Sequence, residues 1–335
     1  MNYPEKYKKE YILLTGGAGY IGSSVAYYLL LKSKNVIIID NFSNSNRNNL
    51  NKLPNQQNLL SFNIDCCNIA SMEHIFISYK ISTIIHLAGF KAVSESIEKP
   101  LLYYQNNLIS TIHLLNLVKV YNIPKFIFSS SATVYGNLES PLSEDNKVGL
   151  DISNPYGQTK YMIERIITDV SKTIENTQFI ILRYFNPIGT INNGLITDNH
   201  TNKPNNLMPI IINSIITKTK FQIFGSDYNT IDGTAARDYI HIEDLALGHI
   251  SAIDFINPIG NFEIFNLGTG NPHTVLEIVK TFEKINSIQL NYTIGYRRPG
   301  DLESIYCSSK KANKILGWKA KKTIEEMCDF RYLFK

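Results

Sequence analysis

The first half of the chain alternates short, continuous apolar runs with longer segments of helical periodicity. The runs are rich in β-branched and aromatic residues: "YILLT" (11–15), "VIIID" (36–40), "LLSFNID" (59–65), "TIIHLA" (83–88), "FIFSSS" (126–131) and "FIILR" (179–183). Such runs are typical of strands buried on both faces of a parallel sheet. Between them, apolar residues occur at helical spacing in segments 20–32, 101–121 and 155–173. The alternation predicts an α/β fold built on a doubly wound parallel sheet.

The pattern changes after about residue 190, where loop-rich stretches such as "NNGLITDNHTNKPNNL" and "GSDYNTIDGTAARD" separate short strands and helices. A chain of 335 residues is long for one compact unit, which favours a large domain beside a smaller one. We therefore expect residues 1–190 to form the sheet domain and residues 191–335 to form an α+β substrate lobe. Part of the lobe's chain is expected to cross back to the sheet.

The glycine-rich segment "TGGAGYIG" directly follows the first predicted strand and opens the first predicted helix. Gly16, Gly19 and Gly22 permit a tight turn and close approach to a pyrophosphate, whose charge is favoured at a helix N-terminus. The second predicted strand ends in Asp40, 18 residues beyond Gly22. A carboxylate there can bind ribose hydroxyls and would repel a 2′-phosphate. The segment predicts a Rossmann domain that binds NAD rather than NADP, although glycines that only permit close helix packing remain an alternative.

The stretch "SNPYGQTKYM" (153–162) places a tyrosine and a lysine on one face of a predicted helix. Asn154 is a favoured cap and Pro155 a favoured first residue, so Tyr156 and Lys160 are neighbours one turn apart. A nearby ammonium and a cationic nicotinamide would both favour the tyrosine's phenolate. Tyr156 could then take a proton from a hydroxyl while a hydride leaves the same carbon, with Ser131 orienting that hydroxyl. Taken alone, the pair is more typical of ordinary surface helix chemistry than of a catalytic site.

Charge and cysteine content narrow the class of protein. The net charge of +4 is mild and the Lys and Arg residues are scattered, which argues against a nucleic-acid or anionic-membrane surface. No run of 18 apolar residues occurs, so we expect a soluble, cytoplasmic protein. The four cysteines and seven histidines lack metal-ligand spacing, so we expect free thiols and no metal site.

The three motifs together resemble the extended short-chain dehydrogenase/reductases: the glycine loop, a serine near the end of the fifth strand, and Tyr-x-x-x-Lys on the next helix. From residue 11 to about 328, further segments resemble the UDP-glucose (UDP-galactose) 4-epimerases: "HLAGFKAVSES", "YYQNN", "FIFSSSATVYG", "NPYGQTK", "RYFNPIG", "PNNLMP", "FGSDYNTIDGTAARDYIH", "NLGTG" and "RRPGD". The resemblance implies an isomerase that interconverts UDP-galactose and UDP-glucose through a 4-keto sugar, using tightly held NAD. It also implies a homodimer packed through the helices near 101–121 and 155–173.

The resemblance assigns roles residue by residue. Tyr156 corresponds to the catalytic base, Lys160 to its partner that also holds the nicotinamide ribose, and Ser131 to the hydroxyl that orients the substrate. Positions matching NAD contacts are Gly16, Gly19, Tyr20, Ile21, Gly22, Asp40, Asn41, Phe42, Ser43, Asn44, Ser45, Asp65, Cys66, Leu87, Ala88, Gly89, Phe90, Lys91, Asn106, Ser129, Ser131, Tyr156, Lys160 and Phe185. Positions matching UDP-sugar contacts are Lys91, Ser131, Tyr156, Asn186, Asn205, Asn206, Leu207, Phe224, Arg237, Arg298, Asp301 and Ile305.

Other readings of these residues stay open. Arg237 and Arg298 suit a diphosphate clamp, because a planar guanidinium fits phosphate oxygens, and a surface salt bridge is the alternative. Nucleotide-sugar 4,6-dehydratases share the motifs but resembling members carry Asp-Glu where this chain has Ala132 and Thr133. A 4-epimerase of a UDP-N-acetylhexosamine or of UDP-glucuronate is a further alternative, and so is a non-catalytic nucleotide-binding regulator. Ile305 stands where relatives carry a large aromatic or a small residue.

Overall fold

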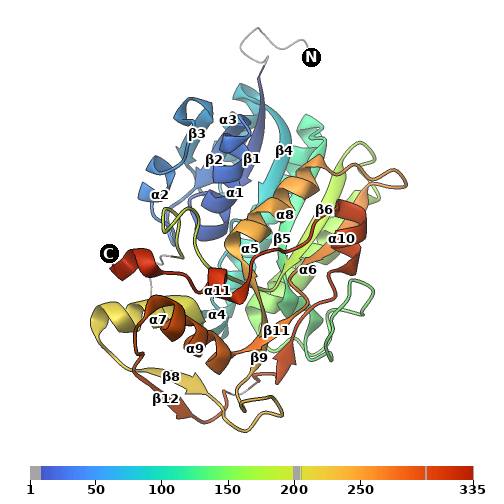
Figure 1. The fold of residues 1–335 in the computed structure, drawn as a ribbon. Helices are drawn as coiled ribbons and strands as arrows, with labels where there is room; N and C mark the ends of the chain where they lie inside the picture. Colours follow the sequence, from blue (N-terminus) through green and yellow to red (C-terminus); the bar gives the residue numbers. More distant parts are fainter. Residues whose placement is uncertain (1–8, 199–203, 205, 299, 335) are drawn as a thin grey trace.

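A computed structural model describes residues 9–198, 204, 206–298 and 300–334 of the chain. Its largest element is a seven-stranded sheet in the order β10-β6-β5-β4-β1-β2-β3, with every neighbouring pair parallel (Figure 1). The strands are β1 (Glu10–Thr15), β2 (Asn35–Asp40), β3 (Leu59–Asn63), β4 (Lys80–His86), β5 (Lys125–Ser131), β6 (Gln178–Tyr184) and β10 (Phe262–Leu267). The α/β class and the doubly wound parallel sheet are confirmed.

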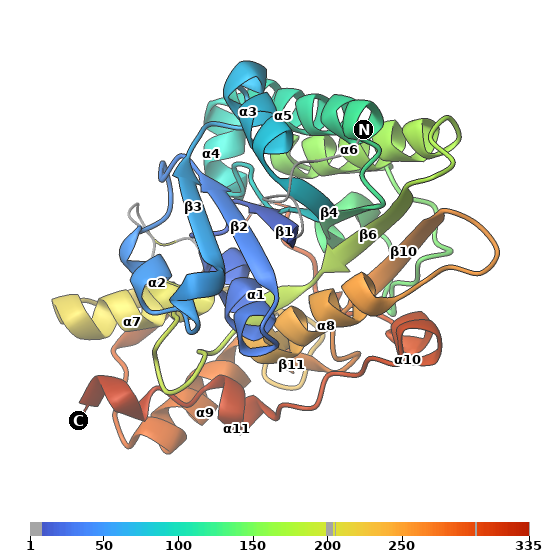
Figure 2. The same ribbon diagram turned by 90° about the horizontal axis from the view of Figure 1, so that it is seen from above.

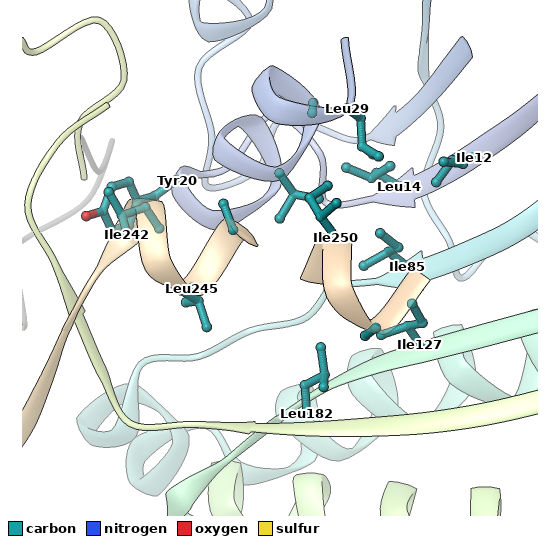
Figure 3. Packing of buried hydrophobic residues seen from close by; sticks show 14 of the residues in the cluster. Ile12, Leu14, Tyr20, Leu29, Ile85, Ile127, Leu182, Ile242, Leu245 and Ile250 are labelled. Carbon is teal, nitrogen blue, oxygen red and sulfur yellow. The ribbon is translucent and has the colours of Figure 1, made fainter. Parts of the chain in front are cut away.

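Helices cover both faces of this sheet (Figure 2). One face carries α1 (Tyr20–Leu31) and α8 (Ile242–Asp254), whereas α3 (Ile69–Ser78), α5 (Pro100–Tyr121) and α6 (Pro155–Ser171) lie on the other. Side chains alternate along each strand, so Ile12 and Leu14 pack toward α8 while Leu13 packs toward the opposite helices. Figure 3 shows the first of these clusters, in which the labelled strand residues Leu14, Ile85, Ile127 and Leu182 lie beside α8.

The second half of the chain forms the smaller layers and returns once to the large sheet. Strand β9 (Ala236–His241) pairs with β7 (Asn186–Ile188), β11 (Pro272–Thr274) and β13 (Ser304–Ile305), and β8 (Phe221–Phe224) pairs with β12 (Tyr292–Gly295). The remaining elements are α2 (Asn48–Asn51), η2 (Gln56–Asn58), α4 (Val93–Glu98), η3 (Ala132–Tyr135), α7 (Leu207–Thr217), α9 (Val275–Asn286), α10 (Lys310–Leu316), α11 (Ile324–Met327) and η4 (Arg331–Phe334). Because β10 and α8 belong to the large sheet's layers, the division at residue 190 stays a prediction.

The described part of the chain contains no helix that is both long and apolar enough to span a bilayer. Its four cysteines, Cys66, Cys67, Cys307 and Cys328, are free, and all except Cys67 are buried.

A buried ion pair joins α6 to the sheet. Arg183 of β6 donates to both carboxylate oxygens of Glu164, from Nε to Oε1 at 3.0 Å and from Nη2 to Oε2 at 2.7 Å. Ser130 Oγ donates to Glu164 Oε1 at 2.5 Å, and Arg183 Nη1 donates to Tyr135 Oη at 3.0 Å. The Tyr135 hydroxyl in turn donates to Asn266 Oδ1 at 2.7 Å. With side chains only 2% and 4% exposed, the pair is stable because these neighbours satisfy its charges.

We expect Arg183→Met to destabilise the protein by about 3–5 kcal/mol, since it leaves the Glu164 carboxylate buried and unpaired. The double variant Arg183→Met/Glu164→Leu should recover most of that loss, because neither charge then remains. Urea unfolding followed by the fluorescence of the single tryptophan, the buried Trp318, measures both. Lys80→Met, which removes the exposed Lys80–Glu10 pair, is the matched control and should change little. A single variant as stable as the parent protein would contradict the role of the pair.

Candidate active site

The glycine loop leaves bare backbone between β1, β4 and the start of α1. Gly16 has φ +68°, and a Cβ on it would lie 2.8 Å from the Ala88 backbone nitrogen. A Cβ on Gly22 would lie 2.4 Å from the Gly16 carbonyl oxygen. Gly19 is the N-cap of α1 and contributes no side chain there. The loop therefore presents the N-terminus of α1 without side-chain cover, as the binding of a pyrophosphate requires.

Asp40 closes the other side of this loop. Its Oδ2 accepts from the Ala18 N–H at 3.0 Å, while its Oδ1 accepts from the Phe42 N–H and the Ser45 hydroxyl, both at 2.8 Å. These bonds hold segment 41–45 against the glycine loop and leave acceptor capacity on Oδ2. In the same segment Asn44 Oδ1 is buried without a hydrogen-bond partner among the described residues. An unmet acceptor beside a bare glycine loop fits a dinucleotide with free hydroxyls.

The loops after β3 and β4 complete this edge of the sheet. After β3, Asp65 accepts from the Cys67 N–H at 2.8 Å and from Asn41 Nδ2 at 3.0 Å. After β4, the loop from Leu87 to Lys91 is held by Asn107, which exchanges hydrogen bonds with the Phe90 backbone at 2.9 and 3.1 Å. Asn107 also donates to the Thr159 hydroxyl at 3.1 Å. Asn107 therefore ties this loop to α6. The sequence does not predict this role, because its only sign there is an asparagine within the helical segment 101–121.

The predicted catalytic side chains meet at the carboxyl end of β5. Asn154 caps α6 by accepting from the Gly157 N–H at 2.8 Å, and Pro155 begins the helix, as the sequence predicts. Lys160 Nζ lies 5.9 Å from the centroid of the Tyr156 ring and donates to the Ser129 carbonyl at 2.6 Å. Ser131, the last residue of β5, lies near the Tyr156 side chain and lowers the pKa of its phenol. The arrangement places a phenol, an ammonium and a hydroxyl around one point at the edge where ligands bind in such sheets.

Burial shifts the pKa values of both titratable groups in this arrangement. Burial raises the pKa of the Tyr156 phenol, and the nearby Ser131 lowers that pKa only in part. Burial also lowers the pKa of Lys160 to about 7, against the opposing charge of Glu164. Lys160 is therefore only partly charged near neutral pH, which limits how far it can stabilise a phenolate.

A cluster of opposite charges lies in the smaller layers. Arg237 Nη2 contacts Asp301 Oδ1 at 2.6 Å, and Arg298 Nη2 contacts Asp301 Oδ2 at 2.9 Å. The Arg298 guanidinium also lies 5.0 Å from the centroid of the Phe224 ring. Arg237 and Asp301 are largely buried and Arg298 is half-exposed. The two arginines therefore form a salt bridge with Asp301, as in the alternative interpretation of the sequence. They still leave a net positive charge next to the aromatic ring of Phe224.

The remaining predicted residues lie at several places around these groups. Ile305 of β13 is in register with Arg237, and it packs in the same apolar cluster as Phe185. Lys91 lies 3.8 Å from Asp198, and Tyr20 donates to the Gly189 carbonyl at 2.7 Å.

Asn186 is exposed at the start of β7, whereas Asn206 and Leu207 begin α7. Asn205 lies outside the described residues. The buried Cys66 and Asn106 of α5 lie beside Cys67, with Cys67 Sγ 3.5 Å from the Asn106 carbonyl oxygen.

Within the described ranges, no three His, Cys, Asp or Glu side chains are grouped so that they could hold a metal ion.

Comparison with known proteins places this geometry in a family. The family model for GDP-mannose 4,6 dehydratase matches residues 13–330. The UDP-glucose 4-epimerase of Caenorhabditis elegans is 43% identical over 336 residues, which cover 95% of each chain. The UDP-glucose 4-epimerase of Bacillus subtilis is 42% identical over 321 residues, covering 95% of this chain and 94% of the relative.

Solved structures agree with these sequence matches. The crystal structure of UDP-glucose 4-epimerase from Bifidobacterium longum, in complex with NAD+ and UDP, matches with a TM-score of 0.90 and 41% identity, covering 96% of this chain and 97% of that one. The UDP-Glc/GlcNAc 4-epimerase of Campylobacter jejuni matches with a TM-score of 0.83 and 29% identity, covering 97% and 98%. The chain therefore belongs to the extended short-chain dehydrogenase/reductase family that the GDP-mannose 4,6 dehydratase model describes, and within it to the UDP-glucose 4-epimerases.

Proposed function

We propose that this chain is an NAD-dependent UDP-glucose 4-epimerase, which interconverts UDP-galactose and UDP-glucose through a 4-keto sugar. The observation that carries the proposal is the meeting of Tyr156, Lys160 and Ser131 at the end of β5, beside a segment that lacks carboxylic acids. Elimination of water, as in a 4,6-dehydratase, needs a further acid and base. Ala132 and Thr133 cannot supply them.

The NAD site would be formed by the glycine loop, Asp40 with segment 41–45, and the loop after β4. When bound, NAD would accept the hydride from C4 of the sugar and give the same hydride back to the keto carbon, so that no net oxidation occurs. The bare backbone at Gly16 and the unmet acceptor on Asn44 support this assignment. The carboxylate of Asp40, already held by three donors, disfavours the 2′-phosphate of NADP.

The chain's own groups handle the proton and the position of the sugar. Tyr156 takes the proton from the sugar's 4-hydroxyl and returns it, and Ser131 orients that hydroxyl. Lys160 is held by the Ser129 carbonyl, from where its charge favours deprotonation of Tyr156. Arg237 and Arg298 hold the nucleotide diphosphate, so the keto sugar can turn over while its nucleotide stays bound. Intact Tyr156, Lys160 and Ser131 argue against a non-catalytic nucleotide-binding regulator.

An association of two copies is also proposed, together with a cytoplasmic location. Helix α5 runs beside α6 and exposes apolar side chains along its outer face, among them Leu101 (79%), Ile112 (42%) and Val120 (64%). Exposed apolar patches of this kind mark protein interfaces in many soluble proteins. A second copy that presents the same face would cover them by two-fold symmetry. The free state of the four cysteines supports a reducing compartment.

The proposal is tested by turnover of UDP-galactose, read by a coupled assay for UDP-glucose, in the parent protein and in Tyr156→Phe. We expect kcat to fall by about 10²- to 10⁴-fold, the usual contribution of a positioned acid–base group. The KM should change little, because the phenol does not hold the nucleotide. Tyr27→Phe on α1, where Tyr27 contacts Tyr28, serves as control. Near-parental turnover in Tyr156→Phe would refute the assignment of the base.

Sugar selectivity is predicted to depend on Ile305. This β-branched side chain is stiff at χ1 and partly buried in an apolar cluster, at the position that the resemblance places against a 2-N-acetyl group. We expect UDP-N-acetylgalactosamine to have a kcat/KM about 5- to 150-fold below that of UDP-galactose, as for overpacking in a core. Ile305→Gly should narrow the gap. Equal efficiency on the two sugars in the parent protein would favour a UDP-N-acetylhexosamine epimerase instead.

The dimer is predicted to depend on the apolar face of α5. Ile112→Asp places a charge in the middle of that face and should convert the protein to a monomer, since an unpaired charge buried in an interface is costly. Light scattering after size-exclusion chromatography gives the mass directly. Ile259→Asp, at a position that is 95% exposed in the loop after α8, should leave the mass unchanged. A parent protein that is monomeric at micromolar concentration would contradict the proposed association.

A further inference from the structure

The side chain of His86 lies inside the protein at the end of β4, and the reaction proposed above does not use it. The residue is 1% exposed. The centroid of its ring lies 6.2 Å from that of Phe126 and 5.8 Å from that of Phe128. Burial and the charge of Lys160 lower the pKa of the imidazole to about 3. His86 is therefore neutral at physiological pH, so one ring nitrogen donates a hydrogen bond and the other accepts one.

Two threonine hydroxyls determine which nitrogen of His86 carries the proton. Nε2 lies 3.0 Å from Thr111 Oγ1 on α5. The Thr111 hydroxyl donates its one proton to the Asn107 carbonyl at 2.8 Å, because a carbonyl oxygen can only accept. Thr111 Oγ1 is therefore the acceptor from His86, and the ring proton lies on Nε2. Nδ1 is left to accept from the Thr15 hydroxyl, 2.8 Å away.

The hydrogen bonds of His86 lead in both directions to the loop after β4. On one side, Thr15 Oγ1 accepts from the Ala88 N–H at 3.3 Å. On the other side, the Asn107 side chain exchanges hydrogen bonds with the Phe90 backbone at 2.9 and 3.1 Å. The path starts at Ala88, passes through His86 and α5, and returns to the same loop at Phe90. The neutral imidazole with its proton on Nε2 therefore completes a closed path that holds this loop at two points.

Ala88 is also the residue of this loop that lies against the glycine loop. A Cβ on Gly16 would lie 2.8 Å from the Ala88 backbone nitrogen, which is the atom that donates to Thr15. Thr15 immediately precedes Gly16, and its carbonyl accepts from the Leu87 N–H at 3.1 Å. The hydroxyl that donates to His86 thus lies at the place where the two loops of the proposed NAD site come closest.

We propose that His86, as the neutral tautomer with its proton on Nε2, is a positioning residue of the NAD site, where it holds the loop Leu87–Lys91 against the glycine loop. The inference rests on the proposed function, because these loops are the ones assigned to NAD. Loops that are already in place lose less entropy when a dinucleotide binds. Retention of NAD should therefore depend on His86. Binding of UDP should not, since Arg237 and Arg298, assigned to the diphosphate, lie in the smaller layers.

The test compares His86→Gln with His86→Asn in the NAD-loaded protein. Glutamine keeps a donor near the place of Nε2 and loses the acceptor for Thr15, whereas asparagine keeps that acceptor and loses the donor to Thr111. We expect bound NAD to exchange with labelled NAD about 10-fold or more faster in His86→Gln, as for a buried polar group left unsatisfied. The acceleration should be smaller in His86→Asn, and calorimetry should show less than a twofold change in UDP affinity in either variant. His74→Gln, at an exposed position on α3, is the matched control and should retain NAD as the parent protein does.

Nitrogen-15 spectroscopy of the parent protein tests the tautomer without any substitution. We expect the His86 ring to show a proton on Nε2 alone at pH 7. A proton on Nδ1, or on both nitrogens, would overturn the proposal. Parental NAD exchange in His86→Gln would also overturn it, as would an equal loss of UDP and NAD affinity, which indicates general damage to the fold. Exchange that is as fast or faster in His86→Asn would exclude the path through Thr15 and have the same consequence. A parent protein that binds no NAD would instead overturn the proposed function itself.

Discussion

The geometry of the candidate active site depends on the buried pair of Glu164 and Arg183. Glu164 lies one turn beyond Lys160 on α6, and Arg183 lies on β6, so the pair fixes the helix that carries Tyr156 against the strand next to β5. A buried charge is tolerated only when its partners are well placed, and here both side chains are fully engaged. The Ser130 hydroxyl donates to the same carboxylate, and Ser130 immediately precedes Ser131. This polar contact therefore fixes the elements that carry Tyr156, Lys160 and Ser131 relative to one another. An ion pair has a single favourable arrangement, whereas apolar packing tolerates small displacements.

The same pair influences the chemistry as well as the geometry. Burial lowers the pKa of Lys160 and the Glu164 charge raises it, with a net value of about 7. A fully buried ammonium without Glu164 nearby would lose its proton more readily still. Tyr156 is subject to the opposite balance, because burial raises its pKa above the ordinary value. A phenol that keeps its proton until substrate and cofactor are both bound avoids an unpaired buried phenolate in the free enzyme.

The sequence predicts a feature well when the residues that encode it lie close together in the chain, and poorly when they lie far apart. The strand of β2, the cap at Asn154 and the glycine loop are encoded by residues within a few positions of each other, so pattern and spacing find them. The ends of the strands are predicted less accurately. The apolar pattern predicts a strand over 59–65, but β3 ends at Asn63. Asp65 instead lies in the turn that follows, where it accepts a hydrogen bond from the Cys67 N–H. Strand β10 carries no local sign that it joins β6 at the sheet's edge. The Arg183–Glu164 pair joins side chains that meet only after the chain has folded, and no local sequence pattern reveals it.

The arrangement of charges in the smaller layers sets how firmly a nucleotide can be held. Asp301 fixes Arg237 and Arg298 in place before any ligand arrives, which reduces the entropy lost when these long side chains are ordered on binding. The same carboxylate repels a diphosphate and cancels the charge of one arginine, so the attraction is weaker than two free guanidinium groups would give. This balance suits an epimerase, because its substrate and product differ only at C4 and either one must be able to leave the site. In the proposed function, firm but incomplete neutralisation of the diphosphate would keep the nucleotide bound while the keto sugar turns, and would still permit release after the hydride has returned.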